Sequence, residues 1–326
     1  MSKEIKTIGV LTSGGDAPGM NATIRAVVRA ALNKGLRVMG IRRGYEGLIN
    51  GDIFEMGPKN VSDIIHRGGT ILYSARCPEF KKLEVQKRGA EMCKVFGIEG
   101  LVVIGGDGSF QGAQKLANLG INTIGIPGTI DLDIACTDYT IGFDTAVNVA
   151  VDALNKLRDT SSSHERCSVV EVMGRDSGHI AVWCGLASGA DVVLIPEKKD
   201  DYSKEKVIRR IIDNRHQGKS HNIVIVAEGV GGSQDLAKEI ENVTGIETRA
   251  TILGHIQRGG TPTALEIKHA SAMGVKAVEL LIDGKSNRVV AYKNNEYVDF
   301  DINEGLAMDK SVDMSLYEIN KVVSRY

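Results

Sequence analysis

The sequence lacks the features that direct a chain to nucleic acid, to a membrane or to an oxidising compartment. Its 40 lysines and arginines balance 41 aspartates and glutamates, so a net charge of −1 gives no global attraction to nucleic acid or anionic lipid. Its five cysteines are odd in number and never spaced as CxxC, which disfavours a zinc ribbon or a disulfide framework. The most apolar tract, 180–196, is broken by Asp191 and glycines, and the first residues show no signal-peptide core. We therefore expect a cytoplasmic protein with no nucleic-acid or membrane partner.

Short apolar runs alternate with amphipathic patterns along most of the chain. The 326 residues, 42% hydrophobic and 25% charged, suit two domains or one elaborated α/β unit. Continuous apolar runs predict strands that are buried on both faces of parallel sheets. Strands are expected at 7–12, 36–42, 101–104, 124–128, 168–172, 192–195, 223–227 and 248–253, with a hairpin at 289–300. Helices are expected at about 17–33, 79–96, 110–118, 143–158, 204–216, 234–243 and 264–282.

Two of the expected strands run into glycine loops that lead to helices. The first loop is Ser13-Gly14-Gly15-Asp16 and the second is Gly105-Gly106-Asp107-Gly108-Ser109. This arrangement points free backbone N–H groups at an anion such as a phosphate. Neither loop is a Walker A motif or a dinucleotide G-x-G-x-x-G motif. Asp107 has the hard oxygen donors that Mg²⁺ prefers, so the second loop indicates a nucleotide-phosphate site.

The segment Ile124–Asp133 carries the candidate catalytic groups. A short strand is expected to stop at Pro127-Gly128 and to expose the next residues at the carboxyl edge of a sheet. In an extended chain Asp131 and Asp133 would share one side. Such a pair suggests one proton acceptor and one group that orients a cation or metal. The alternative is a polar turn whose aspartates cap the next element.

Six segments, in this order, carry a resemblance to a known family: SGGDAPGMNA, GGDGS, PGTIDLD, DTSSSHER, VVEVMGR and RATILGHIQRGG. Together they resemble the bacterial ATP-dependent 6-phosphofructokinases (the phosphofructokinase A family) over essentially the whole chain. The resemblance implies an α/β fold of two doubly wound, Rossmann-like domains with the active site in the interdomain cleft, and a homotetramer. It places the nucleotide-binding domain at 1–141 plus 257–307 and the sugar-phosphate-binding domain at 142–256 plus 308–326.

The implied activity is the glycolytic transfer of the ATP γ-phosphoryl group to the 1-hydroxyl of D-fructose 6-phosphate, with Mg²⁺ as cofactor. Asp131 matches the general base, and Thr129 and Arg175 match groups that stabilise the phosphoryl group in flight. Positive charge from Mg²⁺, Arg76 and Arg175 suits a reaction that needs positioning and charge neutralisation. The residues that match the ATP site are Gly15, Tyr45, Arg76, Cys77, Asp107, Gly108, Ser109 and Gly112, with Asp107 as the metal ligand. The residues that match the sugar-phosphate site are Thr129, Asp131, Arg166, Met173, Gly174, Arg175, Glu228, Arg249, His255 and Arg258.

Departures from the family pattern keep two alternatives open. Leu132 stands where the family has asparagine, so a catalytically weak regulatory subunit is the first alternative. A pyrophosphate-dependent enzyme is the second, because its relatives share the fold. Those relatives carry Asp and Lys where this chain has Gly108 and Gly128. Two glycines leave room near the phosphates and favour ATP.

An effector pocket for ADP or phosphoenolpyruvate is implied between subunits, which predicts allosteric regulation. The matching residues are Arg25, Arg29, Arg158, Gly189, Asp191 and Lys219. Asp191 replaces the usual glutamate, while Pro58 and Gln217 stand where arginine is frequent. Fewer cations weaken anion binding, so control by these ligands is a hypothesis. In the sequence alone, the Arg25 and Arg29 pair fits a solvated helix face equally well.

Overall fold

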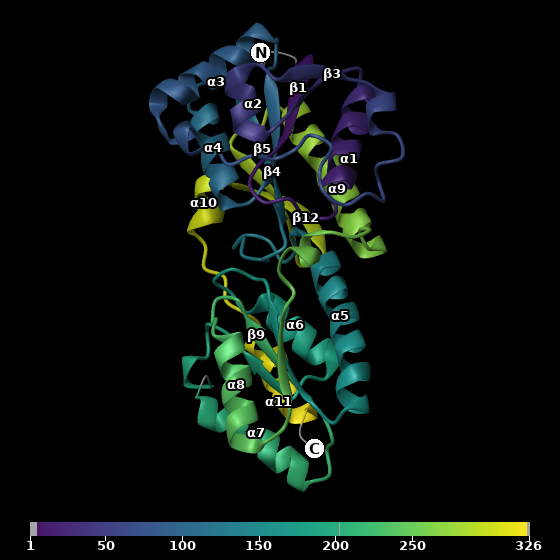
Figure 1. Cartoon of the computed structure of the whole chain (residues 1–326). Helices are drawn as coiled ribbons and strands as arrows, with labels where there is room; N and C mark the ends of the chain where they lie inside the picture. The colour runs from purple at the N-terminus through teal and green to yellow at the C-terminus, as the bar shows by residue number, and fades with distance from the viewer. Residues whose placement is uncertain (1–4, 202, 325–326) are drawn as a thin grey trace. The chain divides into compact units, whose positions relative to one another are not determined.

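The computed structural model describes residues 5–201 and 203–324, and the chain forms two compact units (Figure 1). Unit 1 comprises Met1–Thr145 and Arg258–Lys310, and unit 2 comprises Ala146–Gln257 and Ser311–Tyr326. The chain passes from one unit to the other three times. Neither unit is therefore a continuous segment. No helix within the described residues is long and apolar enough to cross a membrane.

Unit 1 is built on a mostly parallel sheet in the order β12-β11-β5-β4-β1-β2-β3, with β6 paired to β5. Its strands are β1 (Thr7–Thr12), β2 (Arg37–Ile41), β3 (Ile53–Met56), β4 (Gly100–Gly105), β5 (Asn122–Thr129), β6 (Ile141–Gly142), β11 (Arg288–Lys293) and β12 (Glu296–Asp301). Every residue of β1 and β4 is buried, as expected for central strands covered on both faces. The two antiparallel pairings, β2 with β3 and β11 with β12, lie at the ends of this sheet.

Helices cover both faces of the unit 1 sheet. On one face α1 (Met20–Asn33) packs against α9 (Ala264–Ile282), and Figure 1 shows these two helices side by side. Gly274 permits this contact, because a Cβ atom there would lie 2.7 Å from that of Ala26. The other face carries α2 (Gly44–Asn50), α3 (Leu83–Val95), α4 (Asp107–Ala117) and α10 (Ile302–Ala307). Large buried side chains such as Phe110 and Leu116 fill the core on this face.

Unit 2 is a smaller α/β unit with an all-parallel sheet in the order β10-β7-β9-β8. Its strands are β7 (Cys167–Val172), β8 (Val192–Leu194), β9 (Asn222–Ala227) and β10 (Thr248–Ile252). Its helices are α6 (His179–Ser188), α7 (Lys204–His216), α8 (Ser233–Thr244) and α11 (Met314–Val323); α5 (Phe143–Ser163) begins in unit 1 and continues into unit 2. One core forms where α7 and α8 pack on the sheet, and α6 packs against α11.

Short 3₁₀ turns occur in both units, at Pro58–Val61, Pro78–Lys81, Lys199–Asp201 and Gly254–Arg258.

Side-chain caps fix where several helices begin. The Thr263 hydroxyl accepts a hydrogen bond from Glu266 N at 3.1 Å, just before α9. Asp313 accepts from Ser315 N at 2.9 Å at the start of α11. Each cap satisfies a backbone donor that a helix leaves unpaired, which stabilises the helix by about 1 kcal/mol. Polar residues ahead of an apolar pattern therefore define these boundaries.

Several predicted boundaries were wrong, although the α/β order was confirmed. Pro127 and Gly128 do not end β5, which continues to Thr129; Gly128 gains β6 as a partner where β4 ends at Gly105. Helix α5 extends to Ser163, beyond the predicted end at residue 158. Residues 78–81 form a 3₁₀ turn, so that α3 begins only at Leu83. The short elements α2, β3 and β6 were not predicted.

Candidate active site

Three candidate loops meet at one edge of the unit 1 sheet. Strands β5, β4 and β1 are neighbours and run parallel, with Thr12 beside Ile104 and Gly105 beside Pro127. Their carboxyl ends therefore place three segments together: the loop 13–16, the turn at Gly106, and the residues from the end of β5 at Thr129 to Asp133. This is the edge at which open α/β sheets bind ligands.

Hydrogen bonds hold the first two loops against each other. Ser13 N donates to Ile104 O at 3.0 Å, and the Ser109 hydroxyl donates to Ser13 O at 3.1 Å. A Cβ atom at Gly105 would lie 2.5 Å from Ser13 O, so glycine is required for this approach. The loops form one continuous backbone surface.

The start of α4 leaves open space above its first turn. Asp107 and Gly108 are the first residues of the helix, after the N-cap Gly106. A Cβ atom at Gly106 or Gly108 would meet nothing within 4 Å. The backbone amides of the first turn and the positive end of the helix dipole therefore face a space that suits a phosphate. At Gly128 the expected room is absent, because a Cβ there would lie 3.0 Å from Ile104 Cγ2.

The metal site predicted at Asp107 has a donor set of limited size. Among the described residues there is no group of three or more His, Cys, Asp or Glu side chains that could hold a metal. Mg²⁺ commonly takes one or two carboxylates and completes its shell with phosphate oxygens and water. The Asp107 carboxylate beside the open first turn of α4 fits that mode of binding.

Tyr45 and Gly112 support the second loop from beneath. Tyr45 is 4% exposed; its ring stacks on Phe80 with centroids 4.2 Å apart, and its hydroxyl donates to Ser109 O. Burial raises the pKa of Tyr45 well above its usual value. A Cβ atom at Gly112 would lie 2.6 Å from the Tyr45 ring. These contacts favour a supporting role for Tyr45, whereas the Arg76 side chain is exposed.

Arg258, predicted at the sugar-phosphate site, lies beside the first glycine loop. The Arg258 guanidinium donates to Asp16 O at 3.0 Å and lies over Gly15, where a Cβ would be 2.7 Å from Nη1. Within unit 1, Arg258 therefore lies beside a predicted nucleotide loop. Cys77 is half-buried, and burial raises the pKa of its thiol.

The segment after β5 differs from the extended chain that the sequence suggested. Leu132 has φ of 55°, in the left-handed region, so Asp131 and Asp133 are not placed by an extended backbone. The Thr129 hydroxyl lies 3.3 Å from Asp131 Oδ2 and accepts from Asp131 N at 3.2 Å. Asp131 is 7% exposed. The backbone thus turns sharply and holds the candidate base beside a hydroxyl.

In unit 2, a second set of predicted residues gathers at the carboxyl ends of β7 and β9. Glu228 accepts a hydrogen bond from Arg175 N, and Arg175 itself has φ of 57°. Met173 N donates to Gln257 Oε1 at 2.8 Å. Gln257 is fully buried and holds the loop beside His255, a role that the sequence did not reveal. The Arg175 side chain is exposed.

Arg166 and Arg249 lie at the opposite edge of the unit 2 sheet. Arg166 precedes β7, whereas Arg175 follows it, and Arg249 pairs with Ser168 near the start of β7. Glu247 bridges the two arginines, at 2.7 Å from Arg166 Nε and 2.6 Å from Arg249 Nη2. These bonds, first from Arg166 and then from Arg249, lower the pKa of Glu247. Within a single copy of the chain, these two arginines are therefore at the opposite edge of the unit 2 sheet from Arg175 and Glu228.

Most of the predicted effector residues lie close together in unit 2. The buried Asp191 carboxylate pairs with Lys219 and accepts from Asn214 Nδ2 at 3.0 Å and Ile223 N at 2.8 Å. Arg158 donates to Ser188 O, next to Gly189, which ends α6 in the left-handed conformation. Asp191 thus acts as an internal partner of Lys219. Arg25 and Arg29 are on α1 in unit 1, half-buried and exposed respectively.

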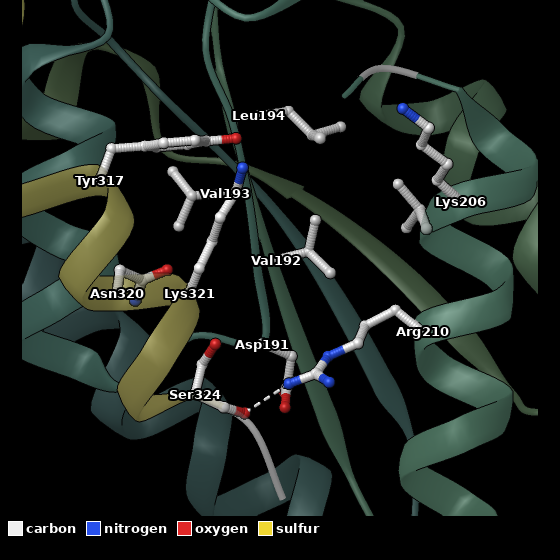
Figure 2. Close-up of a pocket in the computed structure, with 11 residues that line it drawn as sticks. Asp191, Val192, Val193, Leu194, Lys206, Arg210, Tyr317, Asn320, Lys321 and Ser324 are labelled. Atoms are coloured by element: carbon white, nitrogen blue, oxygen red, sulfur yellow. Dashed lines mark hydrogen bonds between the residues drawn. The ribbon is translucent and has the colours of Figure 1, made fainter. Parts of the chain in front are cut away.

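Unit 2 also contains a cavity that the sequence did not predict. It has a volume of about 220 Å³ and lies along β8, between α7 and α11 (Figure 2). Val192 and Leu194 line it together with Tyr317, and Arg210 donates to Ser324 O at 2.8 Å across one end. Of the predicted site residues, only Asp191 borders this cavity.

Comparison with known proteins agrees with the resemblance read from the loops. The family model described as Phosphofructokinase matches residues 7–281. An ATP-dependent 6-phosphofructokinase of Clostridium botulinum (strain Loch Maree / Type A3) is 63% identical over 321 residues, which cover 98% of this chain and 100% of that protein. ATP-dependent 6-phosphofructokinase 1 of Clostridium perfringens (strain 13 / Type A) is 60% identical over 321 residues, with the same coverage. The solved phosphofructokinase of Saccharomyces cerevisiae superposes with a TM-score of 0.87 at 32% identity, over 98% of this chain and 48% of the yeast chain. This chain spans about half the length of that yeast chain.

Proposed function

Because the chain belongs to the phosphofructokinase family, we propose that it transfers the γ-phosphoryl group of ATP to the 1-hydroxyl of fructose 6-phosphate, forming fructose 1,6-bisphosphate and ADP. One observation carries the proposal. Two candidate phosphate loops and the Asp131 carboxylate follow three neighbouring parallel strands and meet at one sheet edge. The sites expected for the phosphate donor and for the proton acceptor therefore lie at the same edge of the sheet.

Phosphoryl transfer requires positioning, charge neutralisation and a hydroxyl that loses its proton as it attacks. The backbone amides at the start of α4 and the open space above Gly108 suit the donor phosphates. Asp107 would hold Mg²⁺, which neutralises charge on the phosphate oxygens when it is bound. Asp131 would accept the proton of the sugar 1-hydroxyl, with Thr129 beside it.

Further residues assigned to the sugar phosphate lie in unit 2. Met173, Gly174 and Arg175 follow β7, with Glu228 beside them and His255 in the 3₁₀ turn after β10. The exposed Arg175 guanidinium would stabilise the transferring group, since a guanidinium matches phosphate oxygens bidentately. The domain assignment follows from these roles, with unit 1 binding nucleotide and unit 2 binding sugar phosphate.

We further propose that active sites are shared between subunits of a homotetramer. Arg166 and Arg249 lie at the amino ends of β7 and β10, away from the carboxyl edge of their own sheet, so we assign them to a phosphate bound by a neighbouring subunit. ADP or phosphoenolpyruvate would bind near Arg158 and Lys219 as an effector. A titration of either ligand that leaves the fructose 6-phosphate saturation curve unchanged would remove the effector proposal.

The direct test measures fructose 1,6-bisphosphate formation by the purified protein with fructose 6-phosphate and either MgATP or Mg-pyrophosphate. We expect turnover with MgATP at about 1–100 s⁻¹. Turnover with pyrophosphate alone would contradict the donor assignment. Binding of both ligands without turnover would favour a regulatory subunit, with Leu132 as the suspected cause.

Asp131→Ser tests the assigned base. Removing a general base costs about 10²–10⁴ in rate, so we expect kcat to fall by at least that range. Dissociation constants for ATP and fructose 6-phosphate should change little, because the phosphate contacts remain. Asp283→Ser is the control, since it removes an exposed carboxylate of unit 1 that lies outside this segment. A loss of less than tenfold in Asp131→Ser would exclude the role.

A further inference from the structure

The half-buried Lys310 contacts residues 134–137, which follow the candidate base Asp131 in the chain. Lys310 follows α10 and is the last residue of unit 1. Its ammonium donates to Thr137 O at 2.6 Å and to Ile134 O at 3.2 Å. Ile134 follows Asp133 directly in the chain, so this contact lies three residues from Asp131.

The same segment is also hydrogen-bonded to Tyr292 of β11. Tyr292 N donates to the Thr137 hydroxyl at 2.9 Å, and Asp138 N donates to Tyr292 O at 2.8 Å. Ile134 and Cys136 are buried in the core, with Gly305 of α10 close to Cys136 Sγ. This scaffold fixes residues 136–139. The carbonyls of Ile134 and Thr137 accept the Lys310 ammonium at the boundary between the scaffold and the sharp turn at Leu132.

We propose that Lys310 is a positioning residue, which fixes Asp131 and Asp133 for phosphoryl transfer by binding the carbonyls of Ile134 and Thr137. The proposal rests on the proposed function. Charge-assisted hydrogen bonds are about twice as strong as neutral ones, and one ammonium can donate to several acceptors at once. A small displacement of a catalytic group, of about 1 Å, can cost about 10²-fold in rate. A lysine without contact to either substrate can therefore control kcat.

The charge of Lys310 adds a pH dependence to the contact. Burial lowers the pKa of Lys310 to about 8, against the raising effects of Asp138, Asp133 and Cys136, while the Lys293 charge lowers it further. The ammonium therefore loses its proton as the pH rises through about 8, and the neutral amine is a weaker donor. An arginine at this position would stay charged across that range.

The test compares wild type with Lys310→Met and Lys310→Arg, and uses Lys293→Met as the matched control. Lys293 is a neighbouring cation that lies over the Phe300 ring, 5.7 Å from its centroid. We expect kcat of Lys310→Met to fall by about ten- to a hundredfold, with KM values within about threefold of wild type. Lys310→Arg should restore most of that loss and lack the decline of kcat above about pH 8. Lys293→Met should stay within about twofold.

Amide hydrogen exchange separates this proposal from the proposed function, because it needs no turnover. Exchange in residues 131–138 should be faster in Lys310→Met than in wild type, with β1 unchanged as an internal reference. Faster exchange without any wild-type turnover would support the contact and refute the proposed function. Unchanged exchange, or a kcat within twofold of wild type in an active enzyme, would overturn the role of Lys310. If Lys310→Met does not fold, the comparison is made between wild type and Lys310→Arg, where equal declines above pH 8 would overturn it.

Discussion

Leu132 adopts a backbone conformation that costs free energy for any residue with a Cβ atom. Its φ of 55° is left-handed, which costs about 1–2 kcal/mol relative to ordinary regions. Its side chain is 6% exposed, and burying a leucine stabilises a fold by about 1.5–3 kcal/mol. Burial therefore roughly offsets the strain, which explains how a branched side chain is tolerated in a conformation that asparagine adopts more readily.

The strain can be measured apart from burial by comparing Leu132→Gly with Leu132→Ala. Both variants lose the same buried side chain, but only glycine relieves the left-handed strain. Against this gain, glycine lowers the free energy of unfolding by about 0.5–1 kcal/mol, because it gives the unfolded chain more conformational freedom. We therefore expect Leu132→Gly to exceed Leu132→Ala by about 0.5–1 kcal/mol in the free energy of unfolding, measured in urea at 25 °C.

Leu253 is the matched control position, because it has the same exposure of 6% and is not among the residues with positive φ. There the order should reverse, with Leu253→Ala more stable than Leu253→Gly by about 0.5–1 kcal/mol. The two glycine-minus-alanine differences should thus differ by about 1–2 kcal/mol. Alanine variants that are the more stable at both positions would refute the argument that Leu132 is strained.

Two further predictions concern the donor site and the buried Glu266. Gly108→Asp places a carboxylate in the open space at the start of α4, so kcat/KM for ATP should fall at least tenfold. The control Asn118→Asp adds the same charge at the other end of that helix and should change kcat/KM little. Equal effects of the two variants would contradict a local cause. Burial raises the pKa of Glu266 to about 7, although Gly142 N and Thr145 N donate to it. Glu266 keeps its proton to a higher pH in the folded state than in the unfolded state. The contribution of this proton to stability is therefore complete below pH 4.5 and is lost as the pH rises through about 7. The unfolding free energy of wild type minus that of Glu266→Gln should therefore fall by about 3 kcal/mol over this range, and a constant difference would contradict the shift.

The sequence predicted those parts of the fold that depend on local patterns. Helix α9 was predicted over its exact range because Thr263 caps it and an apolar stripe runs along it. The end of β5 was misplaced, because pairing with β6 and β4 determines it and proline alone does not. The second glycine loop was predicted too long, because Gly105 ends β4 and Asp107 already begins α4, which leaves only Gly106 between them.

Residues whose roles depend on distant partners could not be predicted. Gln257 holds Met173, and Lys310 holds Thr137, across long separations in the chain. Tyr45 matched a ligand-contacting position in the family, yet its packing on Phe80 depends on tertiary contacts that no local pattern encodes. The predicted roles of the site residues remain predictions until the variants are assayed.

The order of strands has a consequence for biosynthesis. In unit 1, β5 pairs with β11, in which Arg288 lies beside Ile124. The edge of β5 that β11 covers therefore stays unpaired until residue 288 has been synthesised. The four strands of unit 2 all lie between Cys167 and Ile252 and emerge from the ribosome earlier. At about 5–20 residues per second, this leaves seconds during which unit 2 can assemble its sheet while the edge of β5 is still unpaired. Nascent unit 1 therefore presents an open strand edge, the kind of surface that chaperones protect, until β11 has been synthesised.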